Sequence, residues 1–303
     1  MKRFTKVCLI VCGVLAGLGL LFGIIGLSMG FGVRQFLAMA KAGAFNISWS
    51  DDGVKFFGGE DTDREQDASA GADSDWSSDT KTFAAAGVQK LDMELDFGTL
   101  SMEPSQGGAI EVEMNYRSVW GNYSRKIDCM LEGDTLKIQD SVQKSVLKLF
   151  TCDSKDATLV VRIPEGKIFE EVELDIGAAD VIVKAGLNSK KTDFTIGAGH
   201  MTLSGVETGE LDLECGAGQM ELRDVTARNI SAECGLGQIT MDVNGAEEEY
   251  NYEIECGIGR VAVGDSEYSG LGNSKEINNG ANQSMSIDCG VGEVVVSFTK
   301  GVD

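Results

Sequence analysis

Basic residues are scarce in this 303-residue chain: 26 Lys and Arg stand against 48 Asp and Glu, which gives a formal net charge of −22. Nucleic-acid binding needs Lys and Arg to neutralise phosphates, so this shortage argues against it. It also argues against docking onto anionic lipid through a basic patch. Proline is scarcer still, with two residues, but the apolar content of 43% is enough for an ordered core, which argues against wholesale disorder.

Motifs that carry catalysis are missing as well. The chain has no Gly-x-Ser-x-Gly elbow, no His-Glu-x-x-His and no P-loop. Carboxylates are abundant, but they are spread regularly along the chain, whereas catalysis needs a base and charge stabilisers that converge on one groove. The single histidine, His200, is expected to be an ordinary surface residue. We therefore expect no enzymatic activity.

What the chain does have is one short pattern repeated six times around one or two glycines. The copies are Val172–Val183, Thr192–Leu203, Leu211–Leu222, Ile230–Met241, Tyr252–Val263 and Met285–Val296, and their starts lie 20, 19, 19, 22 and 33 residues apart. A repeat of this period is typical of a stacked, quasi-one-dimensional architecture.

Each copy predicts two strands joined by a glycine bend. Leu211, Leu213 and Cys215 alternate with polar residues and share one face. After Gly-Ala-Gly the apolar positions shift by one, to Met220 and Leu222. A regular strand cannot make that shift, whereas glycines in a bend or bulge can. The predicted fold is therefore all-β, a parallel β-helix or β-solenoid with about 19 residues per coil.

The region before the repeats also predicts strands. Residues Leu91–Gly98 alternate with period two, as a half-buried strand does. Further strand candidates are Ile110–Tyr116, Ile127–Leu131, Thr135–Gln139 and Leu159–Ile163, the last closed by Pro164. The one helix candidate after the N-terminal segment is short, at Val142–Leu149.

One inward position of the repeat is taken over by cysteine. The predicted column runs Phe97, Ile176, Ile196, Cys215, Cys234, Cys256 and Cys289. We interpret the four cysteines as core residues where a small apolar side chain fits. A disulfide between neighbouring coils is an open alternative, although parallel Cβ vectors hold the Cβ atoms slightly too far apart. Zinc fits less well because the clustered Cys-x-x-Cys spacing is absent. Cys129 and Cys152 lie outside the repeat and could pair.

The outward position before the cysteines is acidic. This column reads Asp175, Thr195, Glu214, Glu233, Glu255 and Asp288, and like charges on neighbouring strands repel. A solvated face is the ordinary interpretation. A bridging Ca²⁺ ion, which prefers several carboxylate oxygens, is the alternative hypothesis. A second outward column is mixed: Asp180, His200, Gln219, Gln238, Arg260 and Glu293.

The N-terminus predicts a membrane anchor. No charge occurs from Val7 to Val33, long enough for one helical span and longer than a usual signal peptide. The flanking Lys and Arg favour a cytoplasmic N-terminus and an extracellular C-terminal domain. We predict a tip, transmembrane helix and juxtamembrane end over residues 1–41, an acidic flexible linker over 42–82, and the solenoid over 83–303.

The run Leu159-Val160-Val161-Arg162-Ile163-Pro164-Glu165-Gly166, followed by period-20 strands with glycine bends, resembles the bacterial "putative adhesin" domain family. The resemblance implies a membrane-anchored β-solenoid ectodomain and supplies no catalytic residues. It favours a surface protein that binds a cell-wall polymer or another envelope protein. The alternative is an accessory protein that regulates an envelope-stress system. A third possibility is a scaffold whose open last coil, containing Val294–Val296, stacks on another copy.

Overall fold

The computed structural model describes residues 47–50, 53–56, 76–117, 119–120, 123–143, 157–269 and 272–299. The chain divides into two units, Met1–Ala70 and Gly71–Asp303, each considered by itself. In the first, β1 (Ile47–Ser50) and β2 (Gly53–Phe56) pair antiparallel, with Ser50 opposite Gly53.

The predicted membrane span, Val7–Val33, lies outside the described residues. In the part of the chain that the structure describes, no helix is long and apolar enough to cross a membrane.

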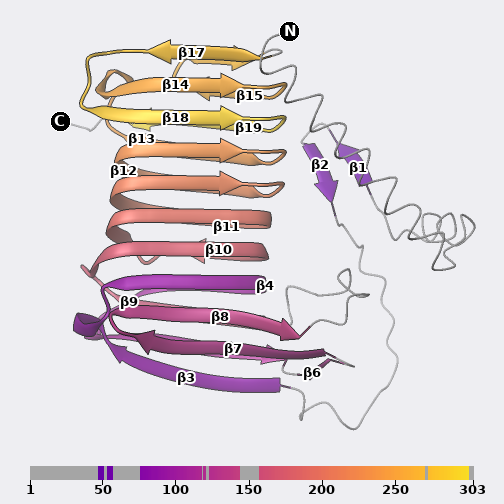
Figure 1. Cartoon of the computed structure of the whole chain (residues 1–303), viewed down its shortest axis with the longest axis vertical. Coiled ribbons are helices and arrows are strands. Elements are labelled where there is room, and N and C mark those ends of the chain that lie inside the picture. The colour runs from indigo at the N-terminus through magenta and orange to yellow at the C-terminus, as the bar shows by residue number, and fades with distance from the viewer. Residues whose placement is uncertain are drawn as a thin grey trace, which may run out of the picture. The chain divides into compact units, whose positions relative to one another are not determined.

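The second unit is built almost entirely from strands, which form one 17-stranded sheet (Figure 1). Its N-terminal strands are β3 (Trp76–Ala84), β4 (Lys90–Ser105), β5 (Ala109–Arg117), β6 (Val119–Trp120), β7 (Tyr123–Glu132), β8 (Thr135–Gln143) and β9 (Ala157–Pro164). The next are β10 (Ile168–Val183), β11 (Leu187–Cys215), β12 (Gln219–Cys234) and β13 (Gln238–Asn244). The last are β14 (Tyr250–Cys256), β15 (Arg260–Val263), β16 (Ser266–Ser269), β17 (Asn273–Ile277), β18 (Gln283–Cys289) and β19 (Glu293–Thr299). The only described helices are the single 3₁₀ turns η1 (Ala85–Gly87) and η3 (Glu247–Glu249).

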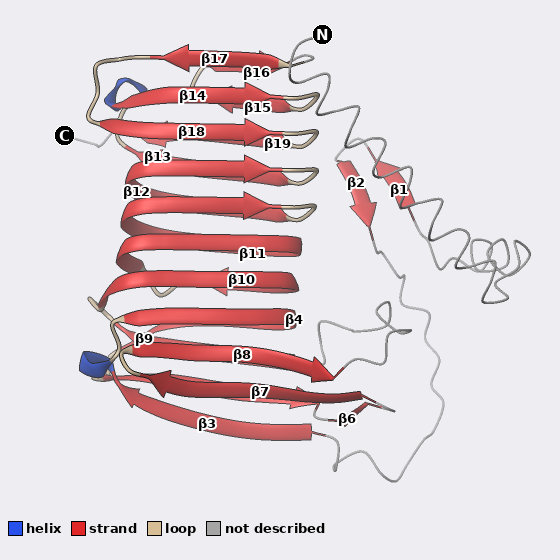
Figure 2. Ribbon diagram, viewed as in Figure 1, coloured by secondary structure: helices blue, strands red, loops and turns tan. Residues whose placement is uncertain are grey.

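The repeats stack as parallel coils, which confirms the β-solenoid prediction (Figure 2). Strand β10 pairs with β11 so that Ile176 lies beside Ile196, and β11 pairs with β12 so that His200 lies beside Gln219. The stack also includes a seventh copy, because β4 pairs in parallel with β10 from Lys90 to Met102. Its inward residue at the cysteine position is Leu95, which pairs with Ile176. The prediction of Phe97 there was wrong by two residues, since Phe97 pairs with Ala178 at the bend.

Glycines allow the coils to turn together at one edge of the stack. The bend backbones continue the sheet ladder from coil to coil: Gly216 N–H donates to the Ile196 carbonyl at 2.9 Å, and Gly235 N–H donates to the Cys215 carbonyl at 2.8 Å. A Cβ built on Gly216 would lie only 2.8 Å from the Gly197 carbonyl oxygen. The bends therefore need glycine because their backbones approach too closely for a side chain.

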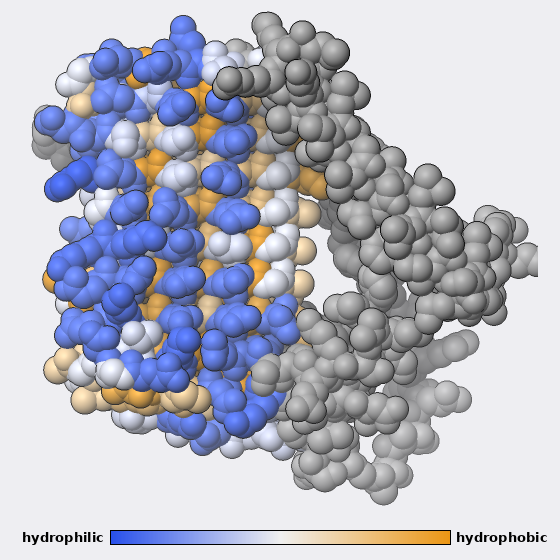
Figure 3. Space-filling view, in the orientation of Figure 1, coloured by the Kyte–Doolittle hydropathy of each residue, from blue (hydrophilic) through white to orange (hydrophobic). Residues whose placement is uncertain are grey.

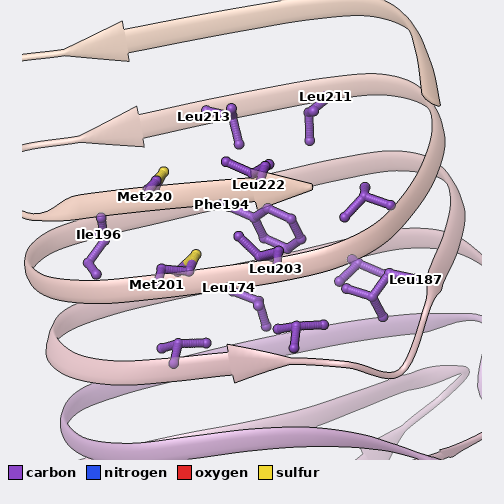
Figure 4. Packing of buried hydrophobic residues seen from close by; sticks show 14 of the residues in the cluster. Leu174, Leu187, Phe194, Ile196, Met201, Leu203, Leu211, Leu213, Met220 and Leu222 are labelled. Carbon is purple, nitrogen blue, oxygen red and sulfur yellow. The ribbon is translucent and has the colours of Figure 1, made fainter. Parts of the chain in front are cut away.

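The core fills the space inside the coils with columns of equivalent side chains (Figure 4). Leu174, Phe194 and Leu213 come from the strand before the bend, and Met201 and Met220 come from the strand after it; all are at most 2% exposed. Equivalent residues of neighbouring strands lie about 4.8 Å apart. Leu213 and Met220 are both buried although they lie an odd number of residues apart, which confirms the predicted shift of the inward positions at the glycines.

The last copy of the repeat is not the last coil. Strand β18 lies between β12 and β14, and β19 lies between β13 and β15 (Figure 1). The sixth copy in the sequence is thus inserted between the fourth and the fifth. Val294–Val296 is paired on both sides, so the predicted open last coil at these residues was wrong.

Short or polar strands close both ends of the stack. At the C-terminal end β17 pairs antiparallel with β14, and β16 pairs antiparallel with β15. At the N-terminal end, the Lys81 ammonium of β3 donates to the Cys129 carbonyl of β7 at 2.9 Å. Short strands and an inward lysine are devices that discourage pairing between exposed sheet edges.

Two predicted boundaries differ from the structure. Strand β3 begins at Trp76, inside the region predicted as flexible linker, because it pairs with all of β5. Val142 and Gln143, the start of the predicted helix, belong to β8, whose pairing with β7 continues to Gln143. The other predicted strands are present and somewhat longer than expected.

Candidate binding face

Carboxylates line the strand that precedes the bend in nearly every coil. In stack order this acidic column is Glu94, Asp175, Thr195, Glu214, Glu233, Asp288 and Glu255. Its acidic members are exposed, and none takes part in an ion pair among the described residues. The predicted column lacks Glu94, because the sequence pattern aligned Phe97, and not Leu95, with the cysteines. Inserting Asp288 between Glu233 and Glu255 makes four consecutive carboxylates, starting at Glu214.

A second row of carboxylates lies on the same face, two residues earlier in each strand. Its members Asp92, Glu173, Asp193 and Asp212 lie on neighbouring coils, where lysines compensate part of the charge. The Lys137 ammonium lies 3.5 Å from an Asp92 carboxylate oxygen, and Lys191 lies 3.8 Å from one of Asp212. Figure 3 shows the hydrophilic side chains of this face in columns that follow the stack.

Crowding changes the ionisation of this second row. Partial burial, followed by repulsion from Asp212, raises the pKa of Asp193. Partial burial, followed by repulsion from Asp92 and Asp193, raises the pKa of Glu173. By contrast, the hydrogen bond from Lys90, at 2.8 Å, lowers the pKa of Glu171.

These shifts predict opposite pH effects for two substitutions. A carboxyl whose folded pKa is raised loses stabilisation as pH rises from about 4 through the raised value. We therefore expect Asp193→Asn to be more stable, relative to wild type, at pH 7 than at pH 4. Glu171 stabilises the fold above its unfolded pKa and loses this contribution as pH falls through its lowered pKa. Glu171→Gln should therefore be less stable, relative to wild type, at pH 7 than at pH 4. Both effects should be below about 1 kcal/mol, since the groups are partly exposed. Urea midpoints at the two pH values measure them, and shifts of the same sign would contradict the assignment.

The mixed column on the strand after the bend is a continuous polar ladder. In stack order it reads Asp180, His200, Gln219, Gln238, Glu293 and Arg260. Gln219 Nε2 donates to Gln238 Oε1 at 3.0 Å, and Gln238 Nε2 donates to Glu293 Oε2 at 2.8 Å. Arg260 then forms an ion pair with Glu293. These contacts exist only because the last copy is inserted, which puts Glu293 next to both Gln238 and Arg260.

Between the two faces, the middle residue of each bend from β10 onward forms an exposed apolar ridge. Its members in stack order are Ala178, Ala198, Ala217, Leu236, Val291 and Ile258. Leu236, Val291 and Ile258 are 68%, 55% and 66% exposed. Large apolar side chains side by side on a surface indicate an interaction site more often than scattered ones do.

The cysteine column is buried behind this ridge. Cys215, Cys234, Cys289 and Cys256 lie in register in that order and are at most 3% exposed, which confirms their place in the core. All four are free thiols. Cys129 is also free and buried, whereas Cys152, its predicted partner, lies outside the described residues.

No compact metal cluster accompanies these columns. Among the described residues, no group of three or more His, Cys, Asp or Glu side chains converges on one point. The acidic column spaces its carboxylates along a line, so calcium bridging between coils stays a prediction.

Comparison with known proteins identifies one family. The family model described as Toastrack DUF4097 matches residues 88–299. No curated protein matches the chain. Solved structures similar to it include a "putative cell adhesion protein" from Clostridium sporogenes, 14% identical, with a TM-score of 0.42, covering 74% of this chain and 100% of that one. A "putative adhesin" from Bacteroides fragilis is 14% identical, with a TM-score of 0.30, covering 73% and 97%. A "putative lipid binding protein" from Parabacteroides distasonis is 13% identical, with a TM-score of 0.33, covering 75% and 96%. These TM-scores are too low to carry an argument about function.

Proposed function

The chain belongs to the Toastrack DUF4097 family, and from this premise we propose that it is a non-catalytic binding protein of the cell surface. Membership agrees with the resemblance to adhesin-like domains of unknown function that the strand-and-bend pattern indicated. In this proposal the N-terminal apolar segment anchors the protein in the membrane, and the solenoid extends outside the cell.

The acidic column is the observation that carries the proposed binding role. Four consecutive carboxylates, from Glu214 to Glu255, repeat at the coil spacing of about 4.8 Å without a basic side chain paired to them. Leaving like charges in register costs stability, so the fold retains an arrangement that packing alone would not favour. The apolar ridge follows the column three residues later in each copy. A partner with regularly spaced positive charges, on an envelope protein or a cell-wall polymer, complements this face.

A charge-neutralised variant tests this role. The binding of fluorescent oligolysine to the full-length protein is measured by anisotropy at low salt. In the test variant the column is neutralised by Glu214→Gln, Glu233→Gln, Asp288→Asn and Glu255→Gln. We expect affinity to fall about tenfold, since each exposed pair contributes roughly 0.2–1 kcal/mol. Binding should also weaken with added salt.

The control variant has the same net charge but neutralises exposed carboxylates elsewhere: Glu132→Gln, Asp134→Asn, Glu248→Gln and Asp265→Asn. Its affinity should change less than twofold. Equal losses in both variants would show that net charge alone attracts the probe, and would remove the proposed site. The location is tested separately by labelling Ile258→Cys with a membrane-impermeant thiol reagent on intact cells. Labelling that appears only after lysis would contradict an extracellular solenoid.

A further inference from the structure

The four cysteines of the solenoid form an uninterrupted file of neighbouring thiols. Cys215 pairs in register with Cys234, Cys234 with Cys289, and Cys289 with Cys256. In chain order Cys256 would follow Cys234, but the insertion of the last copy puts Cys289 between them. Each coil from the copy Leu211–Leu222 to the last coil thus contributes one cysteine to this position, and no other residue type interrupts the series.

Three of the four sulfurs lie close to the glycine backbone of the next coil. A Cβ built on Gly237 would lie 2.7 Å from the Cys215 sulfur, and one on Gly292 would lie 2.7 Å from the Cys234 sulfur. The equivalent Cβ on Gly259 would lie 2.9 Å from the Cys289 sulfur. Each of these three sulfurs therefore points toward the glycine of the next coil in the stack.

Two of the thiols have partners on the strand that follows the bend. The Cys215 thiol donates to the Gln238 carbonyl oxygen at 3.8 Å, and the Cys289 thiol donates to the Arg260 carbonyl oxygen at 3.8 Å. Burial, followed by the neighbouring Cys234 and Cys256, raises the pKa of Cys289 to about 12, so this thiol is protonated at neutral pH.

The spacing of the file suits a bridging ion better than a disulfide. In-register residues of adjacent strands lie about 4.8 Å apart, whereas a disulfide needs Cβ atoms about 3.8 Å apart. A metal–thiolate bond is about 2.3 Å long, so two such bonds in line span about 4.6 Å. Tetrahedral zinc needs four ligands around one point, which a straight file does not provide. Thiolates bind soft metal ions preferentially, and Cu(I) is a monovalent ion of this kind.

We propose that the cysteine file Cys215–Cys234–Cys289–Cys256 binds Cu(I)-type soft monovalent ions, one between each pair of neighbouring sulfurs. Four sulfurs enclose three gaps. Metal ligation requires thiolates, so three ions bound between four sulfurs displace four thiol protons to solvent and leave the file with one negative charge. No electron transfer is involved, since the ion enters and stays as Cu(I).

The test is transfer of Cu(I) from a coloured chelator to the reduced full-length protein under anaerobic conditions. Wild type should remove up to three ions per chain more than the variant in which Cys215, Cys234, Cys256 and Cys289 are all valine. It should release about four protons for three bound ions and gain thiolate-to-Cu(I) absorption in the ultraviolet. Valine is suitable because Ile176 and Ile196 occupy the same column in other coils. Cys129→Val is the matched control, since Cys129 is buried but has no place in the file, and it should bind as wild type does.

Should the fourfold variant fail to fold, Cys234→Val with Cys289→Val provides a milder one. Two coils then lie between the remaining thiols, Cys215 and Cys256, so the extra Cu(I) uptake should disappear. Equal uptake by wild type and a folded file variant would overturn the proposal, as would no uptake by wild type at all.

Discussion

Gly237→Ala is expected to destabilise the protein by about 3 kcal/mol, because the added methyl group has no space. The new Cβ would collide with the Gly218 carbonyl oxygen of the neighbouring coil and would lie 2.7 Å from the Cys215 sulfur. The Gly218 carbonyl belongs to the bend ladder, where it accepts a hydrogen bond from Gln238 N–H at 3.0 Å. The coils can separate only by weakening such bonds. Urea unfolding monitored by circular dichroism measures the loss.

Gly108→Ala is the matched control for this substitution. Gly108 has no atom within 4 Å of a built Cβ and lies in a turn outside the stacked bends. Its free energy of unfolding should stay within about 0.5 kcal/mol of wild type. If both variants lose the same stability, the cost comes from glycine replacement in general, and the close approach of the coils is not its cause.

Ending the chain after Gly280 is expected to unfold the C-terminal end of the solenoid while the earlier coils remain. The truncation removes β18 and β19, which pair on both sides with neighbouring coils. Burial of their five inward side chains contributes on the order of 10 kcal/mol, at about 1.5–3 kcal/mol for each large one. Those residues are Met285, Ile287, Cys289, Val294 and Val296. A solenoid tolerates local loss because each coil contacts only its neighbours.

Hydrogen exchange measures which strands survive. Protection should disappear from β14 to β17 and persist in β10 and β11. A chain that ends after Thr299 keeps all of β19 and should show the wild-type pattern. The informative contrary result is full protection of β14 in the shorter chain. It would mean that the fifth copy stacks directly on the fourth, so that the inserted coil is dispensable for closing the stack.

Local pattern was sufficient for much of this structure. The alternation in Leu211–Leu222, interrupted by Gly-Ala-Gly, predicted strand, bend and strand, and the burial of Leu213, Cys215 and Met220 confirms it. The outward position of the acidic residues followed from the same alternation. These features are predictable because strand periodicity and the conformational freedom of glycine act within a few residues.

The register of the copy in β4 was not predictable in the same way. Its bend contains Asp96, Phe97 and Gly98, whereas the later coils carry Gly177-Ala178-Ala179 or Gly-x-Gly, so aligning the sequence by apolar type put Phe97 in the cysteine column. The pairing of β4 with β10 puts Leu95 there. A two-residue error preserves the inward face, because the strand period is two, and only the neighbouring strand can decide between the choices.

The sequence alone was enough to establish a β-solenoid of short coils with a buried thiol column and an acidic outer column. It could not establish the order of the coils. Every copy presents the same inward and outward positions, so the local sequence pattern does not determine which copy stacks on which. Long-range pairing determines the order of the coils. Strands β16 and β17 pair back onto the terminal coil, and Glu293 contacts Gln238 on one side and Arg260 on the other. Only the tertiary structure therefore decided that Asp288 completes the acidic column and that Cys289 completes the file of thiols.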